Sequence, residues 1–117
     1  MARVLAVVAL ALALPASVAA FPVGLQVTPH TVPRGQIVHV HGNVGNGCSH
    51  HGSVTVISSA FHAGHEFAGV NAISIRIRSS GNFAATTRIP GSRAPGAYHV
   101  VARCGGGSFG NITLHVT

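Results

Sequence analysis

The chain has 117 residues, of which 47% are hydrophobic, and it carries a formal net charge of +6 when its nine histidines are counted as neutral. Lysine and aspartate are absent and Glu66 is the only acidic residue, which excludes a glycosidase with paired carboxylates, an EF-hand loop and a Walker A lysine. A chain of this length accommodates one small domain of about 100 residues.

The first 20 residues have the pattern of a secretory signal peptide. Arg3 supplies the positive charge, and residues 4–14 form an uninterrupted apolar stretch. Small residues follow, so we expect cleavage after Ala19 or Ala20. The apolar stretch is shorter than the ~20 residues that a membrane-spanning helix needs. The sequence therefore predicts one domain, residues 21–117, that is secreted or associated with the cell envelope and has no transmembrane segment.

The rest of the sequence shows no helical periodicity. It contains short runs in which apolar and polar residues alternate, separated by glycine and proline, and this is the pattern of half-buried β-strands. The runs lie at residues 25–27, 37–42, 53–57, 73–78, 83–89, 98–104 and 112–116. Seven short strands in ~100 residues predict an all-β fold, an immunoglobulin-like two-sheet antiparallel sandwich.

The clearest alternation is in residues 73–78, and the run 83–89 follows it closely. We predict that the two form a hairpin with a three-residue loop over 79–81, in which Gly81 takes the left-handed position. In the immunoglobulin arrangement the run 37–42 pairs with the run 83–89. We expect the run 83–89 to pair on its other side with the run 73–78. One sheet face would then carry a cluster of basic side chains: His39, His41, Arg76, Arg78 and Arg88.

Cys48 and Cys104 are the only cysteines, and export would place them in an oxidising compartment that favours a disulfide. Cys48 lies between the second and third predicted strands, and Cys104 ends the sixth. The connections at these points share one end of an immunoglobulin-like sandwich, so the bond would join two neighbouring loops. It would stabilise the fold by about 4 kcal/mol in the chain-entropy model. A thiol nucleophile or a metal ligand is the alternative role.

Several motifs of turn and core positions extend over the predicted domain. They are Leu25-x-Val27-x-Pro29, Gly35-x-x-Val38-x-Val40-x-Gly42, Cys48, Gly81-Asn82-Phe83, Pro95-Gly96-Ala97-Tyr98-x-Val100-x-Ala102-x-Cys104 and Leu114-x-Val116. In these motifs the chain resembles small exported immunoglobulin-like domain proteins of actinobacteria. The resemblance implies an envelope or secreted module without indicating an activity. The apo-chromoproteins that carry enediyne antibiotics resemble the architecture more distantly, which implies small-molecule carriage as an alternative, although this chain lacks their second disulfide.

Nine histidines, all after residue 20, are the unusual feature of the composition. His39 and His41 are two residues apart in one predicted strand, so both project from one face, and imidazole suits Cu, Ni and Zn. His50 and His51 lie beside Cys48. These four histidines are candidate metal ligands, with ordinary polar surface positions as the alternative. Histidine also gains a proton between about pH 7 and pH 5, which predicts a pH-responsive surface.

Candidate catalytic residues are few. The segment His62-x-x-His65-Glu66 superficially resembles zinc-protease motifs, but its order differs, and Gly64 disfavours a helix that presents both rings. Glu66 cannot be both base and third metal ligand. The sequence contains no nucleophile elbow and no phosphate-binding loop.

We therefore expect a non-catalytic module that binds an envelope polymer or a partner protein. Removal of Arg3 leaves six arginines and one glutamate, a formal charge of +5, which suits an anionic partner. The arginines are dispersed and the aromatic residues are few, so nucleic acid is disfavoured as that partner. A transition-metal-binding or pH-responsive protein is the alternative.

Overall fold

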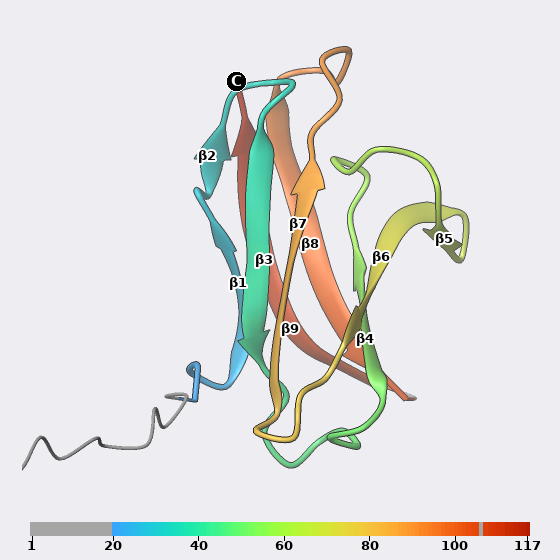
Figure 1. Ribbon diagram of the computed structural model, residues 1–117. Coiled ribbons are helices and arrows are strands. Elements are labelled where there is room, and N and C mark those ends of the chain that lie inside the picture. Colours follow the sequence, from blue (N-terminus) through green and yellow to red (C-terminus); the bar gives the residue numbers. More distant parts are fainter. Residues whose placement is uncertain (1–19, 106) are drawn as a thin grey trace, which may run out of the picture.

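The structure is a computed structural model that describes residues 20–105 and 107–117. Within these residues the chain forms nine β-strands and no helix, and the strands make two sheets that pack against one another (Figure 1). The all-β prediction is therefore confirmed. Residues 1–19, which hold nearly all of the predicted signal peptide, lie outside the described part of the chain.

Seven of the nine strands lie where alternation predicts a strand, and the two-residue strands β2 and β5 are additional. The strands are β1 (Gly24–Thr28), β2 (Thr31–Val32), β3 (Ile37–Asn43), β4 (Ser53–Ile57), β5 (Glu66–Phe67), β6 (Val70–Arg76), β7 (Asn82–Arg88), β8 (Gly96–Cys104) and β9 (Gly107–Val116). One sheet has three strands in the order β1-β3-β7, and the other has six in the order β2-β9-β8-β4-β6-β5. All neighbours are antiparallel except β2 and β9, which are parallel.

The predicted pairing of residues 37–42 with 83–89 is confirmed, because β3 pairs with β7. The predicted pairing of 73–78 with 83–89 is wrong, because β6 pairs with β4 in the other sheet. Beyond β6, the backbone N–H of Ile77 donates to the carbonyl of Gly52 at 2.9 Å, which keeps the chain beside β4. The chain then crosses between the layers through the predicted loop over residues 79–81, which is closed by hydrogen bonds from the N–H of Arg78 to the carbonyl of Asn82 and from the N–H of Gly81 to the carbonyl of Arg78, both at 2.8 Å. Gly81 has a φ of 86°, so its predicted left-handed conformation is confirmed. Ile77 and Phe83 are therefore both buried from opposite sheets rather than as neighbours in one hairpin.

Buried apolar side chains from both sheets form one core between the layers. Its largest fully buried members are Phe61, Phe83, Ile89 and Leu114. Along each strand, side chains that point into this core alternate with side chains that point outward. The outward side chains of the three-stranded sheet therefore do not contribute to this core.

The predicted disulfide is present. Cys48 lies in the connection between β3 and β4, Cys104 is the last residue of β8, and their Cα atoms are 5.9 Å apart, a usual separation for a disulfide. Two buried asparagines close the same end of the sandwich: Asn43 Nδ2 donates to Asn82 Oδ1 at 2.9 Å, while Asn43 Oδ1 accepts from the N–H of Gly45 at 2.7 Å. The connections at this end are thus joined both covalently and by hydrogen bonds.

Candidate functional site

The outer face of the three-stranded sheet presents His39 and His41. The side chains before and between them, Val38 and Val40, are fully buried, so alternation turns both histidines outward as the sequence predicts. In register, His39 lies between Thr28 of β1 and Thr86 of β7.

Arg88, at the end of β7, belongs to the same outer face as the two histidines, but two of the arginines predicted there do not. Arg76 lies in β6 of the other sheet, where it is in register with Ser53, and Arg78 lies in the β6–β7 connection. Both are displaced because β6 pairs with β4 and not with β7. The basic cluster on this face is therefore smaller than the sequence analysis predicts.

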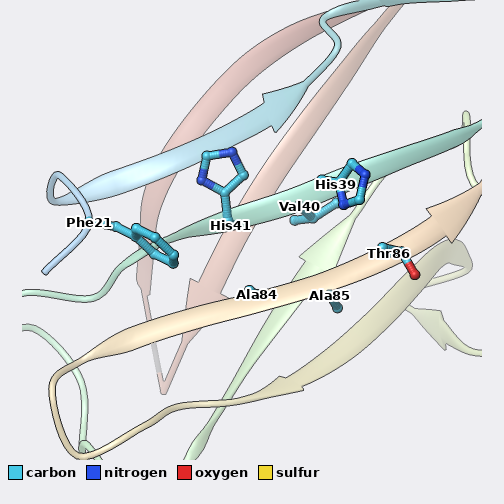
Figure 2. A pocket seen from close by; sticks show the side chains of 7 residues that line it. All are labelled: Phe21, His39, Val40, His41, Ala84, Ala85 and Thr86. Carbon is cyan, nitrogen blue, oxygen red and sulfur yellow. The ribbon is translucent and has the colours of Figure 1, made fainter. Parts of the chain in front are cut away.

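A shallow hollow of about 430 Å³ lies on this face (Figure 2). Phe21 borders the hollow and is held there by two contacts: its backbone N–H donates to Asn82 Oδ1 at 2.9 Å, and its ring packs edge-on against the His41 ring at a centroid distance of 5.5 Å. Figure 2 shows the His41 ring beside Phe21 rather than turned toward His39. The full lining is Phe21, His39, Val40, His41, Ala84, Ala85 and Thr86.

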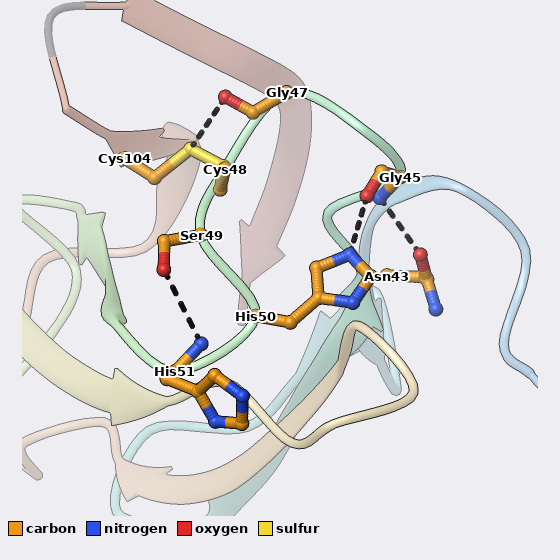
Figure 3. Close-up of a disulfide and its surroundings, with 8 residues drawn as sticks. All are labelled: Asn43, Gly45, Gly47, Cys48, Ser49, His50, His51 and Cys104. Atoms are coloured by element: carbon orange, nitrogen blue, oxygen red, sulfur yellow. Dashed lines mark hydrogen bonds between the residues drawn. A yellow bond between two sulfur atoms is a disulfide. The ribbon is translucent and has the colours of Figure 1, made fainter.

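His50 has a different environment from His51, although the sequence places them together. The Nδ1 atom of His50 lies 3.0 Å from the carbonyl oxygen of Ser79, and its Nε2 atom lies 2.8 Å from that of Gly45. Both ring nitrogens of His50 therefore lie against backbone carbonyl oxygens, and a neutral imidazole can donate a hydrogen bond to only one of them at a time. The His51 side chain is exposed, and its backbone N–H lies 3.5 Å from Ser49 Oγ (Figure 3).

The candidate metal ligands do not form one cluster. Within residues 20–105 and 107–117, no group of three or more histidine, cysteine or acidic side chains is placed to hold an ion. A metal bound by His39 and His41 would therefore need further ligands from water or a partner. Metal binding by these residues stays a prediction.

The zinc-protease-like segment lies in the exposed connection that leads into β5. His62, His65 and Glu66 are all exposed, and His62 Nδ1 lies 3.4 Å from Thr87 Oγ1 of β7. Glu66 is the first residue of β5 and is in register with Asn71 of β6. The acid therefore lies on a strand of the six-stranded sheet, away from the histidines of β3.

A second hollow, of about 470 Å³, lies between β6 and the outer edge of β7. No sequence pattern indicates this hollow, because it exists only where β6 and β7 diverge into different sheets. It is bordered by His62, Gly64, His65, Ala72, Ile73, Ser74, Ala85 and Thr86.

Arg93 fixes the connection that carries the histidines of this second hollow. Its Nε donates to the carbonyl of Ala60 at 3.3 Å, and its guanidinium NH2 group donates to the carbonyl of Phe61 at 2.8 Å. These contacts join segments more than 30 residues apart, so no local sequence pattern indicates them. They hold the start of the histidine-bearing segment against the core.

In comparisons with known proteins, no protein-family model, no curated protein and no solved structure matches this chain. Among the described residues, no helix is long and apolar enough to span a membrane. The function is therefore inferred from the geometry of the two hollows and the charges around them.

Proposed function

We propose that residues 21–117 form an exported, non-catalytic immunoglobulin-like module that acts by binding an anionic envelope component or a partner protein. The Cys48–Cys104 disulfide supports export to an oxidising compartment. The proposed kinship is with the small exported actinobacterial domains that the sequence motifs resemble.

The immunoglobulin-like assignment is supported by two features. β1 and β3 share a sheet with β7, while β4, β8 and β9 belong to the facing sheet, and immunoglobulin domains divide the corresponding six strands in the same way. β6 departs from the constant-type arrangement, because it lies in the facing sheet beside β4. Tyr98, near the start of β8, donates its hydroxyl hydrogen to the carbonyl of Ala94 four residues earlier. Immunoglobulin domains make a similar tyrosine contact near the start of the corresponding strand.

The observation that carries the binding proposal is the outer face of β1-β3-β7. His39, His41 and Arg88 provide basic groups on this face, and the hollow between β3 and β7 has an apolar floor with small side chains. The lining of the hollow contains no carboxylate. A face with this charge and shape attracts an anionic ligand that can approach its floor closely.

The position of Glu66 supports a non-catalytic role. Acid–base and nucleophilic mechanisms require the participating groups to lie within hydrogen-bond reach of one another. Glu66 is exposed on β5, and within the described residues its carboxylate makes no hydrogen bond or ion pair. Hydrolytic schemes that depend on this acid therefore have no assembled site.

The test is retention of the purified, disulfide-bonded mature chain on envelope fractions of the producing organism. A variant with His39→Gln, His41→Gln and Arg88→Gln is compared with a control that loses basic groups elsewhere, His99→Gln with Arg76→Gln. We expect the first variant to lose salt-sensitive retention and the control to keep most of it. Equal retention of all three proteins, or substrate turnover abolished by Glu66→Gln, would overturn the proposal.

A further inference from the structure

β7 is an edge strand whose outer side has no β-partner among the described residues. It pairs with β3 on one side, and the sheet ends there (Figure 1). The N–H of Ile89 donates toward β3, to the carbonyl of Gln36, whereas the carbonyl of Asn82 accepts on the opposite side from the N–H of Arg78. Backbone groups alternate in direction along an antiparallel strand. The N–H and C=O groups of Ala84, Thr86 and Arg88 therefore lie in the plane of the sheet and point away from β3, toward the open edge.

A groove runs beside this edge of β7. The hollow of about 470 Å³ lies between Ala85 and Thr86 of β7 and residues 72–74 of β6. The hollow on the outer face reaches the same stretch of β7 from the other side, through Ala84, Ala85 and Thr86. The side chains that β7 itself contributes to both hollows are thus small, while the exposed His62 and His65 border the groove beyond the edge.

The charges around the β7 edge favour an acidic partner. Exposed edge strands are normally protected by charged side chains, proline or a bulge, and the central outward side chains of β7 are the uncharged Ala84 and Thr86. Arg88 lies at one end of the strand and Arg78 in the turn before the other end. No carboxylate lines either hollow. A second copy of this basic chain would be repelled, whereas an acidic segment would be attracted.

We propose that β7 accepts an extended acidic peptide segment of a partner protein as a fourth strand of the β1-β3-β7 sheet. The inference rests on the proposed binding function and specifies its partner and binding mode. Backbone groups of Ala84, Thr86 and Arg88 pair with the peptide. Alternate peptide side chains then face in two directions: the acidic ones lie on the outer face near Arg88 and His39, and the apolar ones enter the groove toward Ile73.

The probe for this test is a short peptide in which glutamate and valine alternate, titrated into the isotope-labelled mature chain and followed by amide chemical shifts. We expect shifts concentrated in β7 and in residues 72–74 of β6. In a Thr86→Pro variant, proline removes an outward N–H that makes no native sheet bond, so the fold should persist. Its affinity should fall by about tenfold or more. Thr86→Val, which keeps the N–H and loses only the hydroxyl, should bind like the wild type.

A second arm does not depend on the folding of any variant. The same peptide with N-methyl groups at alternate residues lacks the donors that strand addition needs, and its affinity for the wild type should fall by a similar factor. Peptides that alternate glutamine or lysine with valine should bind more weakly than the glutamate peptide and show less salt dependence.

Three results would overturn the inference. The first is that the glutamate peptide does not bind. The second is that the N-methylated peptide binds the wild type, and the unmodified peptide binds Thr86→Pro, as tightly as the unmodified peptide binds the wild type. The third is a dimer that forms through β7 without any peptide. If Thr86→Pro is retained on envelope fractions and binds the peptide as tightly as the wild type, the β7 edge is not the peptide site, but the proposed binding function is still supported. If the wild type itself is not retained on the envelope, the proposed function fails whatever the peptide does.

Discussion

Gly42 is the position at which a single methyl group should disturb the functional sheet most. It lies in β3 in register with Leu25 of β1 and Phe83 of β7. A Cβ atom added at Gly42 would collide with the carbonyl oxygen of Gly24 and would lie 2.8 Å from Phe83 Cζ. The Gly24 carbonyl belongs to the backbone and cannot rotate away, and the Phe83 ring is fully buried and has no space to move into. The Gly42→Ala variant can therefore form only if β1 moves away from β3.

The expected loss in free energy of unfolding is about 3 kcal/mol. Overpacking a dense core costs roughly 1–3 kcal/mol, and moving β1 would weaken ladder hydrogen bonds of about 1 kcal/mol each. A loss of this size is a large part of the ~5–15 kcal/mol that stabilises a typical domain. For a domain of this size it corresponds to a fall in Tm of roughly 12–24 °C.

The measurement is urea unfolding of the oxidised mature chain, followed by circular dichroism. The matched control is Gly91→Ala, because a Cβ at Gly91 meets no atom within 4 Å and the residue is exposed in a connection. The control should stay within about 0.5 kcal/mol of the wild type. Equal stability of the two alanine variants would refute the close approach of β1 and β3 at Gly42.

Three further predictions concern the disulfide and the histidines. Replacing both cysteines with serine should lower the free energy of unfolding by about 4 kcal/mol in urea titrations, since the bond closes a loop with a sequence separation of 56; an unchanged midpoint would contradict this. Calorimetric titration with Cu, Ni and Zn should show binding near pH 7.5 that weakens near pH 5.5 and is reduced in His39→Ala/His41→Ala; binding that the double variant leaves intact would place the ligands elsewhere. His50→Phe should lower stability by about 1–3 kcal/mol through two lost carbonyl contacts, whereas His51→Phe should change it little; equal effects in thermal unfolding would contradict the difference in their environments.

The positions of the longer strands could be predicted because one face of each strand is buried. Val38 and Val40 are fully buried while His39 between them is exposed, so the period of two in the sequence reports burial directly. The disulfide could be predicted because two cysteines allow one intramolecular pairing.

The sheet to which β6 belongs could not be predicted in the same way. Ile75 and Ile77 point into the core, and they would do so from either layer of a sandwich. Alternation specifies which side of a strand is buried, but it does not specify which strand lies beside it. The hydrogen bonds that hold this part of the chain beside β4, such as the one from Ile77 N–H to the Gly52 carbonyl, join residues that are distant in sequence.

One change of pairing explains both the smaller basic cluster and the proposed docking edge. Had β6 paired with β7, Arg76 would lie on the histidine face, and the outward backbone groups of Thr86 would be occupied by a neighbouring strand. Because β6 pairs with β4, the face keeps only Arg88 of the three predicted arginines, while the edge of β7 and the groove beside Ile73 become accessible. The same pairing thus removes two arginines from the histidine face and leaves the backbone of β7 exposed as a directional binding site. A partner held mainly by that edge should therefore depend more on its backbone N–H groups than on its number of acidic residues.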